Sequence, residues 1–158
     1  MPALRSGLMP QPLLLDRGVY LQVVAHSYDG LPLEACGLLA AEPASGRVTR
    51  CYPTGNEAAS ARVYTVPPKA LLLADRDAEE RGLVLAGVFH SHTHTTAYPS
   101  PTDVAQAPDP AWHYVLVGLG EGAPVVRSYR IVGGSVEEEP VVLSAARPGW
   151  ESGGPGSG

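Results

Sequence analysis

The sequence has few of the features that mark secreted, membrane-bound or nucleic-acid-binding proteins. Its 158 residues include only two cysteines, Cys36 and Cys51, which are too few for a disulfide framework and favour free thiols. No apolar run approaches the roughly 18 residues of a membrane span. The N-terminal residues also lack the continuous apolar core of a signal peptide. We therefore expect a cytoplasmic protein without a membrane partner.

Clustered positive charge is absent as well. The formal net charge is −5, and no lysine and arginine cluster occurs. A nucleic-acid surface needs a basic patch, so we expect no nucleic-acid partner. The hydrophobic content of 44% with 17% charged residues indicates a globular chain. We predict one domain over residues 13–147, between a flexible N-terminus (1–12) and a flexible tail rich in glycine and serine (148–158).

Strand and helix patterns alternate along the predicted domain. Strands are predicted over 13–15, 35–41, 47–52, 62–66, 83–89, 112–119, 125–132 and 136–143. Helices are predicted from the cap residue Asp16 to Asp29-Gly30, from Pro68 to about Arg81, and from Pro101. Residues 83–89 are too apolar for a strand with one solvated face, so we place them mid-sheet, covered on both sides. Gly133-Gly134 fits a hairpin turn. The expected fold class is α/β, with a mixed sheet flanked by helices in a single domain.

The most informative segment is HSHTHTTAYPSPTD, residues 90–103, which follows the apolar strand directly. Alternate residues of a strand face the same way, so His90 and His92 present both rings on one face. Two histidines and one carboxylate, here Asp103, are the protein ligands of many hydrolytic zinc sites, in which water takes the fourth position. The segment therefore predicts a metal site at the end of a central strand.

Hydrolysis also needs a group that moves a proton, and Glu34 is the candidate. It begins the predicted buried strand, where a carboxylate is unexpected unless it faces a polar cavity. Zinc lowers the pKa of a bound water to about 7. Glu34 would take the proton of such a water and return it to the leaving amine.

Structural interpretations of the same residues stay open at this point. Ser100 and Asp103 also read as a helix start, with serine as the N-cap residue and an acid three positions later. His94 shares the strand face of His90 and His92, so a site of three histidines is an alternative. Cys36 lies in an apolar run and favours a buried, inert thiol.

Together, Glu34, His90-x-His92, Ser100 and Asp103 resemble the JAMM motif of the MPN-domain metallopeptidases. The segments EACGLLA, FHSHT, AYPSPTDV, HYVLV and VRSYRIVGG are similar to those of the small bacterial members. The resemblance implies the MPN fold, which is related to the cytidine deaminases. It implies zinc held by His90, His92 and Asp103. It also implies Glu34 as general acid and base, and Ser100 as a group that stabilises the carbonyl oxygen.

The resemblance, which covers residues 13–143, also implies a substrate. The small bacterial members release cysteine, or a short extension, from ubiquitin-fold sulfur-carrier proteins. We thus expect a peptidase or isopeptidase that acts after the C-terminal Gly-Gly of such a carrier, in cysteine biosynthesis. His94 and Tyr98 are candidate substrate contacts. A zinc hydrolase of small molecules and a catalytically silent MPN scaffold are the alternatives.

Overall fold

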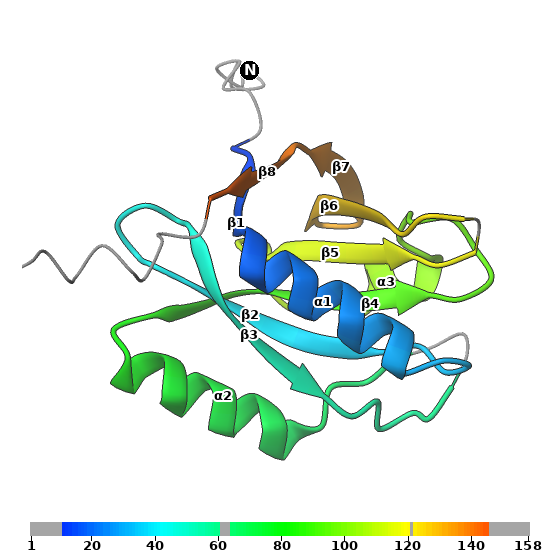
Figure 1. Ribbon diagram of the computed structural model, residues 1–158, viewed down its shortest axis with the longest axis horizontal. Coiled ribbons are helices and arrows are strands. Elements are labelled where there is room, and N and C mark those ends of the chain that lie inside the picture. Colours follow the sequence, from blue (N-terminus) through cyan, green and yellow to red (C-terminus); the bar gives the residue numbers. More distant parts are fainter. Residues whose placement is uncertain (1–10, 61–63, 121, 146–158) are drawn as a thin grey trace, which may run out of the picture.

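The structure, a computed structural model, describes residues 11–60, 64–120 and 122–145 (Figure 1). The predicted flexible N-terminus, apart from residues 11 and 12, and the predicted tail lie outside the described residues. Within the described part, the chain forms these elements: β1 (Leu13–Asp16), α1 (Arg17–Asp29), β2 (Cys36–Ala41), β3 (Val48–Thr54), α2 (Pro68–Glu80), β4 (Val84–His92), α3 (Pro101–Ala105), β5 (His113–Gly118), β6 (Val125–Val132), β7 (Ser135–Glu139) and β8 (Val141–Ser144).

The strands form one mixed sheet in the order β7-β6-β5-β4-β2-β3-β1-β8. Strand β4 runs parallel to β5 and antiparallel to β2. Strand β1 runs parallel to both β3 and β8. This arrangement confirms the predicted α/β class, and it confirms that the apolar strand after residue 83 lies in the middle of the sheet.

Helices α1 and α2 cover opposite faces of the sheet. Val19 and Val23 of α1 pack in a buried cluster with Phe89 of β4. Ala74 of α2 packs in a second cluster with Val88, the neighbour of Phe89 on the same strand. Because side chains alternate along a strand, the α2 face is also the face on which His90 and His92 lie. Within the described residues, no helix is long and apolar enough to cross a membrane.

Proline 140 divides what the sequence predicts as one strand over residues 136–143. That prediction was wrong: β7 pairs antiparallel with β6, whereas β8 pairs parallel with β1 at the other edge of the sheet. Proline has no N–H for a strand ladder, and the Pro140 carbonyl instead accepts a hydrogen bond from the N–H of Leu13, 2.8 Å away. Consecutive strands thus occupy the two edges, and the sheet curls round until these edges meet (Figure 1).

Three further local predictions had different outcomes: a strand was wrong, a helix cap was right in position only, and a glycine turn was right. The described part of the predicted strand over 62–66, residues 64–66, is neither strand nor helix, and residues 62 and 63 lie outside the described chain. Asp16 is the N-cap residue of α1, as predicted, but its side chain makes no capping hydrogen bond. Its carboxylate instead accepts hydrogen bonds from Arg47 and from Ser144, each at 2.8 Å. The glycine turn is confirmed, because Gly133 and Gly134 have φ values of 55° and 80°, as a type I′ hairpin requires.

Candidate active site

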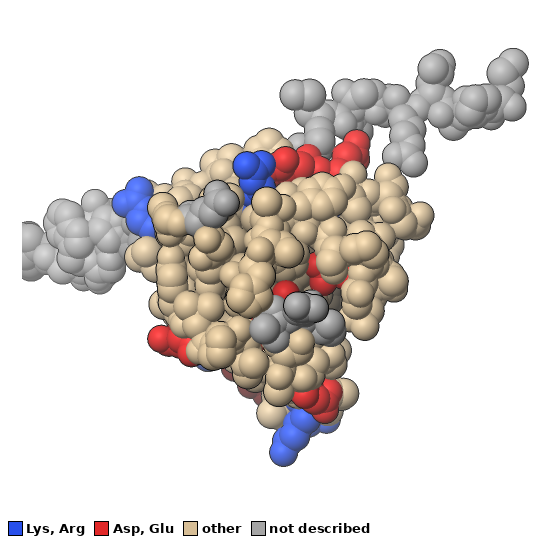
Figure 2. Space-filling model, turned by 90° about the vertical axis from the view of Figure 1, so that its right-hand side faces the viewer, with Lys and Arg blue, Asp and Glu red and all other residues tan. Residues whose placement is uncertain are grey.

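The two histidines of the site lie at the end of β4, in the middle of the sheet. Register places His90 opposite Leu116 and His92 opposite Gly118 of β5. Both side chains are almost fully buried, with exposed fractions of 2% and 3%. Figure 2 views the molecule from the side toward which β4 and β5 run. Charged side chains lie mainly at the margins of this face, and acidic side chains are set in a hollow near its middle.

Helix α3 brings the candidate carboxylate ligand toward these rings. Ser100 is its N-cap residue, and its Oγ accepts a hydrogen bond from the N–H of Asp103 at 3.1 Å. In return, Asp103 Oδ2 accepts a hydrogen bond from the N–H of Ser100 at 2.8 Å. This reciprocal capping box fixes the carboxylate. The helix-start interpretation of the two residues is therefore correct, and it is compatible with a site role because the same oxygen faces the histidines.

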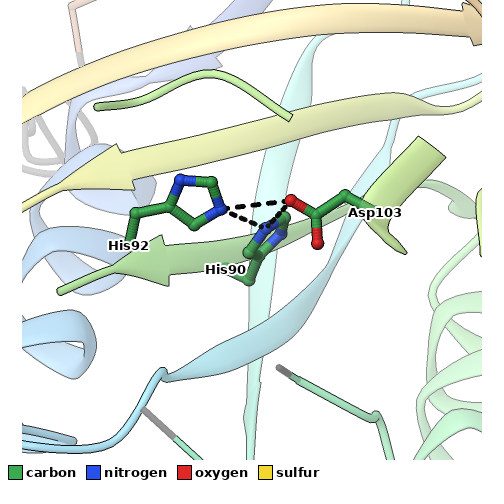
Figure 3. A group of neighbouring side chains, drawn as sticks. All are labelled: His90, His92 and Asp103. Carbon is green, nitrogen blue, oxygen red and sulfur yellow. Dashed lines mark hydrogen bonds and ion pairs between the residues drawn. The ribbon is translucent and has the colours of Figure 1, made fainter. Parts of the chain in front are cut away.

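Three ligand atoms converge at this point (Figure 3). His90 Nε2 and His92 Nε2 each lie 3.1 Å from Asp103 Oδ2, and the two nitrogens lie 3.2 Å apart. Around a tetrahedral zinc ion with bonds of about 2.0–2.1 Å, ligand atoms are roughly 3.3 Å apart. The spacing and chemistry of the donors therefore fit a zinc ion. His94, which the three-histidine alternative requires, is exposed and is not part of this group in the described chain.

The protonation of the group also suits metal binding. Thr96 offers its carbonyl to His92 Nδ1 at 2.7 Å, so that nitrogen carries a proton and donates. Burial lowers the pKa of His90. Burial alone would raise the pKa of Asp103, but hydrogen bonds with the two histidines outweigh it and hold that pKa well below its usual value. Burial favours the neutral form of His92, yet its contacts with Asp103 and Thr96 raise its pKa above 6.5. A metal ion would thus compete with a proton at His92.

Glu34 lies beside this group because β2 and β4 are tied together. Cys36 pairs with His90, and the N–H of Ser91 donates to the carbonyl of Ala35 at 2.9 Å, which places Glu34 across from His92. Glu34 is only 4% exposed, and its Oε2 has no hydrogen-bond partner among the described residues. Burial raises its pKa from 4.5 to about 7; His92 opposes the rise and Asp103 adds to it. Such a carboxyl is suited to proton transfer near neutral pH.

Tyr64 is a site residue that the sequence did not single out. Its ring stacks on the His90 ring, with centroids 4.0 Å apart and planes at 18°. Because Tyr64 is buried, this contact restricts the orientation of the candidate ligand. The only signal was an aromatic residue in a segment that we predicted to be a strand. Its approach to His90 depends on a loop path that sequence patterns do not specify.

The two candidate substrate contacts lie on the loop that follows β4. His94 and Tyr98 are both exposed. The Tyr98 ring packs edge-on against Tyr129 of β6, with centroids 5.5 Å apart, and the Tyr129 hydroxyl donates to the carbonyl of Ala97. The loop is thereby fixed to the sheet next to the candidate metal ligands. A substrate role for these two residues stays a prediction.

The family model described as prokaryotic homologues of the JAB domain matches residues 16–132, which include Glu34, both histidines, Ser100 and Asp103. The CysO-cysteine peptidase of Mycobacterium tuberculosis is 43% identical over 139 residues, or 87% of this chain and 94% of the relative. A Thermus thermophilus protein named probable TtuB-protein conjugate cleaving protease is 35% identical over 67% of this chain and 70% of its own.

A solved structure shows the same fold. The solution structure of protein DSY2949 from Desulfitobacterium hafniense has a TM-score of 0.78 and 34% identity, and the match covers 85% of this chain and 94% of that one. These comparisons confirm the resemblance that the motif indicated. The chain belongs to the prokaryotic JAB-domain family, within the JAMM and MPN proteins.

Proposed function

We propose that this protein is a zinc-dependent peptidase that hydrolyses the amide bond after the C-terminal Gly-Gly of a ubiquitin-fold sulfur-carrier protein. It releases cysteine or a short peptide. The observation that carries the proposal is the buried convergence of His90, His92 and Asp103 with Glu34 beside them. The names of the relatives, CysO-cysteine peptidase and TtuB-protein conjugate cleaving protease, support this substrate class.

In this proposal, His90, His92 and Asp103 would hold the zinc ion. The chemistry that zinc supplies in such sites is Lewis acidity, which polarises a carbonyl and lowers the pKa of a bound water to about 7. The hydrogen bond from His92 Nδ1 to the Thr96 carbonyl orients this ligand. In zinc sites, the ring nitrogen that does not bind the metal usually makes such a bond.

Glu34 and Ser100 carry the remaining steps. Glu34 takes one proton from the attacking water, whose oxygen bonds to the scissile carbonyl carbon. It then delivers the proton to the nitrogen that leaves as the carbon–nitrogen bond breaks. The Oγ of Ser100 accepts from the N–H of Asp103, so its own hydroxyl proton is available to donate to the carbonyl oxygen as negative charge develops there.

The burial of the site favours a thin substrate. Because the ligands and Glu34 are almost fully buried, a folded domain is kept from the scissile position, whereas an extended tail that ends in glycine residues fits. The proposal also places the protein in the cytoplasm, where cysteines stay reduced, because both of its cysteines are free.

The test is to mix the zinc-loaded protein with a carrier that ends in Gly-Gly-Cys and to weigh the products. We expect the carrier to lose the mass of one cysteine residue, and we expect no loss with the Glu34→Gln variant. An intact carrier in the presence of fully zinc-loaded protein would contradict the proposal. Hydrolysis of a small amide by the same preparation would then favour the small-molecule alternative.

A further inference from the structure

A pocket of about 540 Å³ lies beside the loop that follows β4. Its walls are the loop after β4, with His94, Thr95 and Thr96, the end of β5 and the turn after it, with Gly118 and Gly120, and the beginning of β6, with Arg127. Two of these residues also contact a candidate metal ligand.

These two residues are Thr96 and Gly118, and the ligand that both contact is His92. The carbonyl of Thr96 accepts a hydrogen bond from His92 Nδ1 at 2.7 Å, and Gly118 pairs with His92 across β4 and β5. A molecule in this pocket would therefore touch residues that themselves contact His92, a proposed zinc ligand.

The pocket is held open by the strands and by the loop anchor. A side-chain carbon at Gly118 would lie 3.3 Å from the Cβ of Ala97, so a larger residue would crowd the loop. The hydroxyl of Tyr129, on β6, donates a hydrogen bond to the Ala97 carbonyl and so fixes the loop to the sheet. The cavity is thus preformed, as binding pockets usually are.

The charge in the pocket favours an anion. Among the described residues that line it, Arg127 is the only lysine or arginine, and none is an aspartate or glutamate, although the whole chain carries a net charge of −5. One donor, Nη1 of Arg127, contacts Glu138 at 3.0 Å, in a pair of half-exposed side chains. Exposed pairs of this kind contribute little. Since the guanidinium has five N–H donors, several remain for a carboxylate.

We propose that this pocket receives the residue released by cleavage, and that Arg127 binds the α-carboxylate of that residue. This inference rests on the proposed function. A single residue after Gly-Gly carries the free carboxylate at a fixed, short distance from the scissile bond. A longer extension carries it further away. Arg127 therefore makes the enzyme selective for one C-terminal residue, such as cysteine, over a longer peptide.

The first test compares two substrates that differ only at this carboxylate, a carrier ending in Gly-Gly-Cys and the same carrier ending in the cysteine amide. A charge-assisted contact should make the wild-type kcat/KM about tenfold or more higher for the free acid. Arg127→Ala should remove this preference by slowing cleavage of the acid alone, while Arg127→Lys should retain part of it. Arg76→Ala, which removes an exposed arginine of α2, is the matched control and should behave as wild type.

The second test does not depend on turnover. Free L-serine resembles cysteine but lacks the thiol that would bind zinc. Added to the metal-free protein, it should shift the backbone amide NMR signals of Gly118 and Gly120. Serinamide should not shift them, and neither ligand should do so in Arg127→Ala.

The outcomes separate the two proposals. Equal cleavage of the acid and the amide by the wild type, or an equal loss for both in Arg127→Ala, overturns the carboxylate site while leaving the peptidase intact. If neither carrier is cleaved, the proposed function fails and the serine titration decides. Arginine-dependent shifts then uphold a carboxylate site, and absent or arginine-independent shifts overturn it.

Discussion

Ser91 Oγ accepts a hydrogen bond from the backbone N–H of Ala35 at 2.8 Å, and the N–H of Ser91 donates to the Ala35 carbonyl at 2.9 Å. Ser91 lies between His90 and His92, and Ala35 follows Glu34 directly. This doubly bonded pair therefore sets the position of the proposed base relative to two proposed zinc ligands. Ser91 is completely buried, so no water replaces the side-chain contact.

Replacing Ser91 should separate positioning from metal binding. In Ser91→Ala the buried N–H of Ala35 loses its acceptor, at a cost of about 1–3 kcal/mol in the free energy of unfolding. We expect kcat to fall while one zinc per chain is retained, because the three ligands are untouched. Ser91→Thr keeps the hydroxyl and serves as the control. Urea unfolding, zinc analysis and the carrier assay give the three readouts, and wild-type kcat in Ser91→Ala would remove the positioning role.

Changing Glu34 to glutamine should leave zinc binding intact and nearly abolish turnover. Glutamine is close in size but does not accept a proton, and general acid–base catalysis contributes about 10²- to 10⁴-fold. Zinc analysis and mass spectrometry of the carrier measure the two effects. Turnover within threefold of wild type would be inconsistent with Glu34 as the base.

The same variant gives a pH-dependent difference in stability. Burial raises the pKa of Glu34 from 4.5 to about 7. The folded, metal-free protein therefore binds more protons than the unfolded chain between these values. Stability contributed by the protonated carboxyl is fully present below pH 4.5 and is lost as the pH rises through 7. The free energy of unfolding of the metal-free wild type should thus decrease relative to Glu34→Gln over this interval. A difference that stays constant with pH would contradict the raised pKa.

The choice between aspartate and a third histidine as ligand is open to direct measurement. Asp103→Asn keeps an oxygen acceptor for the N–H of Ser100 but loses the negative charge, so α3 should form while zinc content and activity fall. His94→Ala should keep one zinc per chain, since His94 is exposed and apart from the ligand group. The reverse pattern, with zinc kept in Asp103→Asn and lost in His94→Ala, would establish the three-histidine site.

Glu139 should be important for stability and not for the metal. It is buried at the end of β7, next to Pro140, where it contacts His113 and accepts hydrogen bonds from Ser128 Oγ at 2.8 Å and Arg130 Nε at 2.9 Å. Burial alone would raise the pKa of Glu139, but these partners outweigh it and lower that pKa below 4.5. Its stabilisation is therefore present above pH 4.5 and is lost as the pH falls through the lowered value.

Glu139→Gln should accordingly lower the free energy of unfolding by about 3 kcal/mol at pH 7, because the half-buried guanidinium of Arg130 loses the buried carboxylate with which it pairs. The deficit should shrink in acid. Urea unfolding at pH 7 and below pH 4 measures both, and unchanged zinc content is the control. A deficit that is the same in acid would assign the loss to packing instead of charge.

The sequence predicts the centre of the fold better than its edges. The run before His90 is apolar at nearly every position, which places the strand mid-sheet without any knowledge of its neighbours. The stretch around Pro140 alternates like one strand, and its division between the two edges follows from how the sheet curls, which is a long-range property. Tyr64 sits in a strand-like pattern, yet residues 64–66 form no strand and the Tyr64 ring packs on His90.

The site divides in the same way. His90, His92 and Asp103 are close in sequence, and the strand period with a capped helix start brings them together. Glu34 lies 56 positions before His90. It was predicted because a carboxylate is unexpected at the start of a buried strand and because it completes the family motif, but only the β2–β4 register places it beside the histidines. The roles of Ser91 and the Thr96 carbonyl depend on that register and on the loop path. No local pattern of serine or threonine predicts them.

The most direct test of the account is a zinc titration of the metal-free protein in the presence of a carrier that ends in Gly-Gly-Cys. We predict no cleavage without metal, and a rate that rises in proportion to added zinc and levels off at one equivalent per chain. Cleavage by the metal-free protein, or an intact carrier at one bound zinc per chain, would contradict the account.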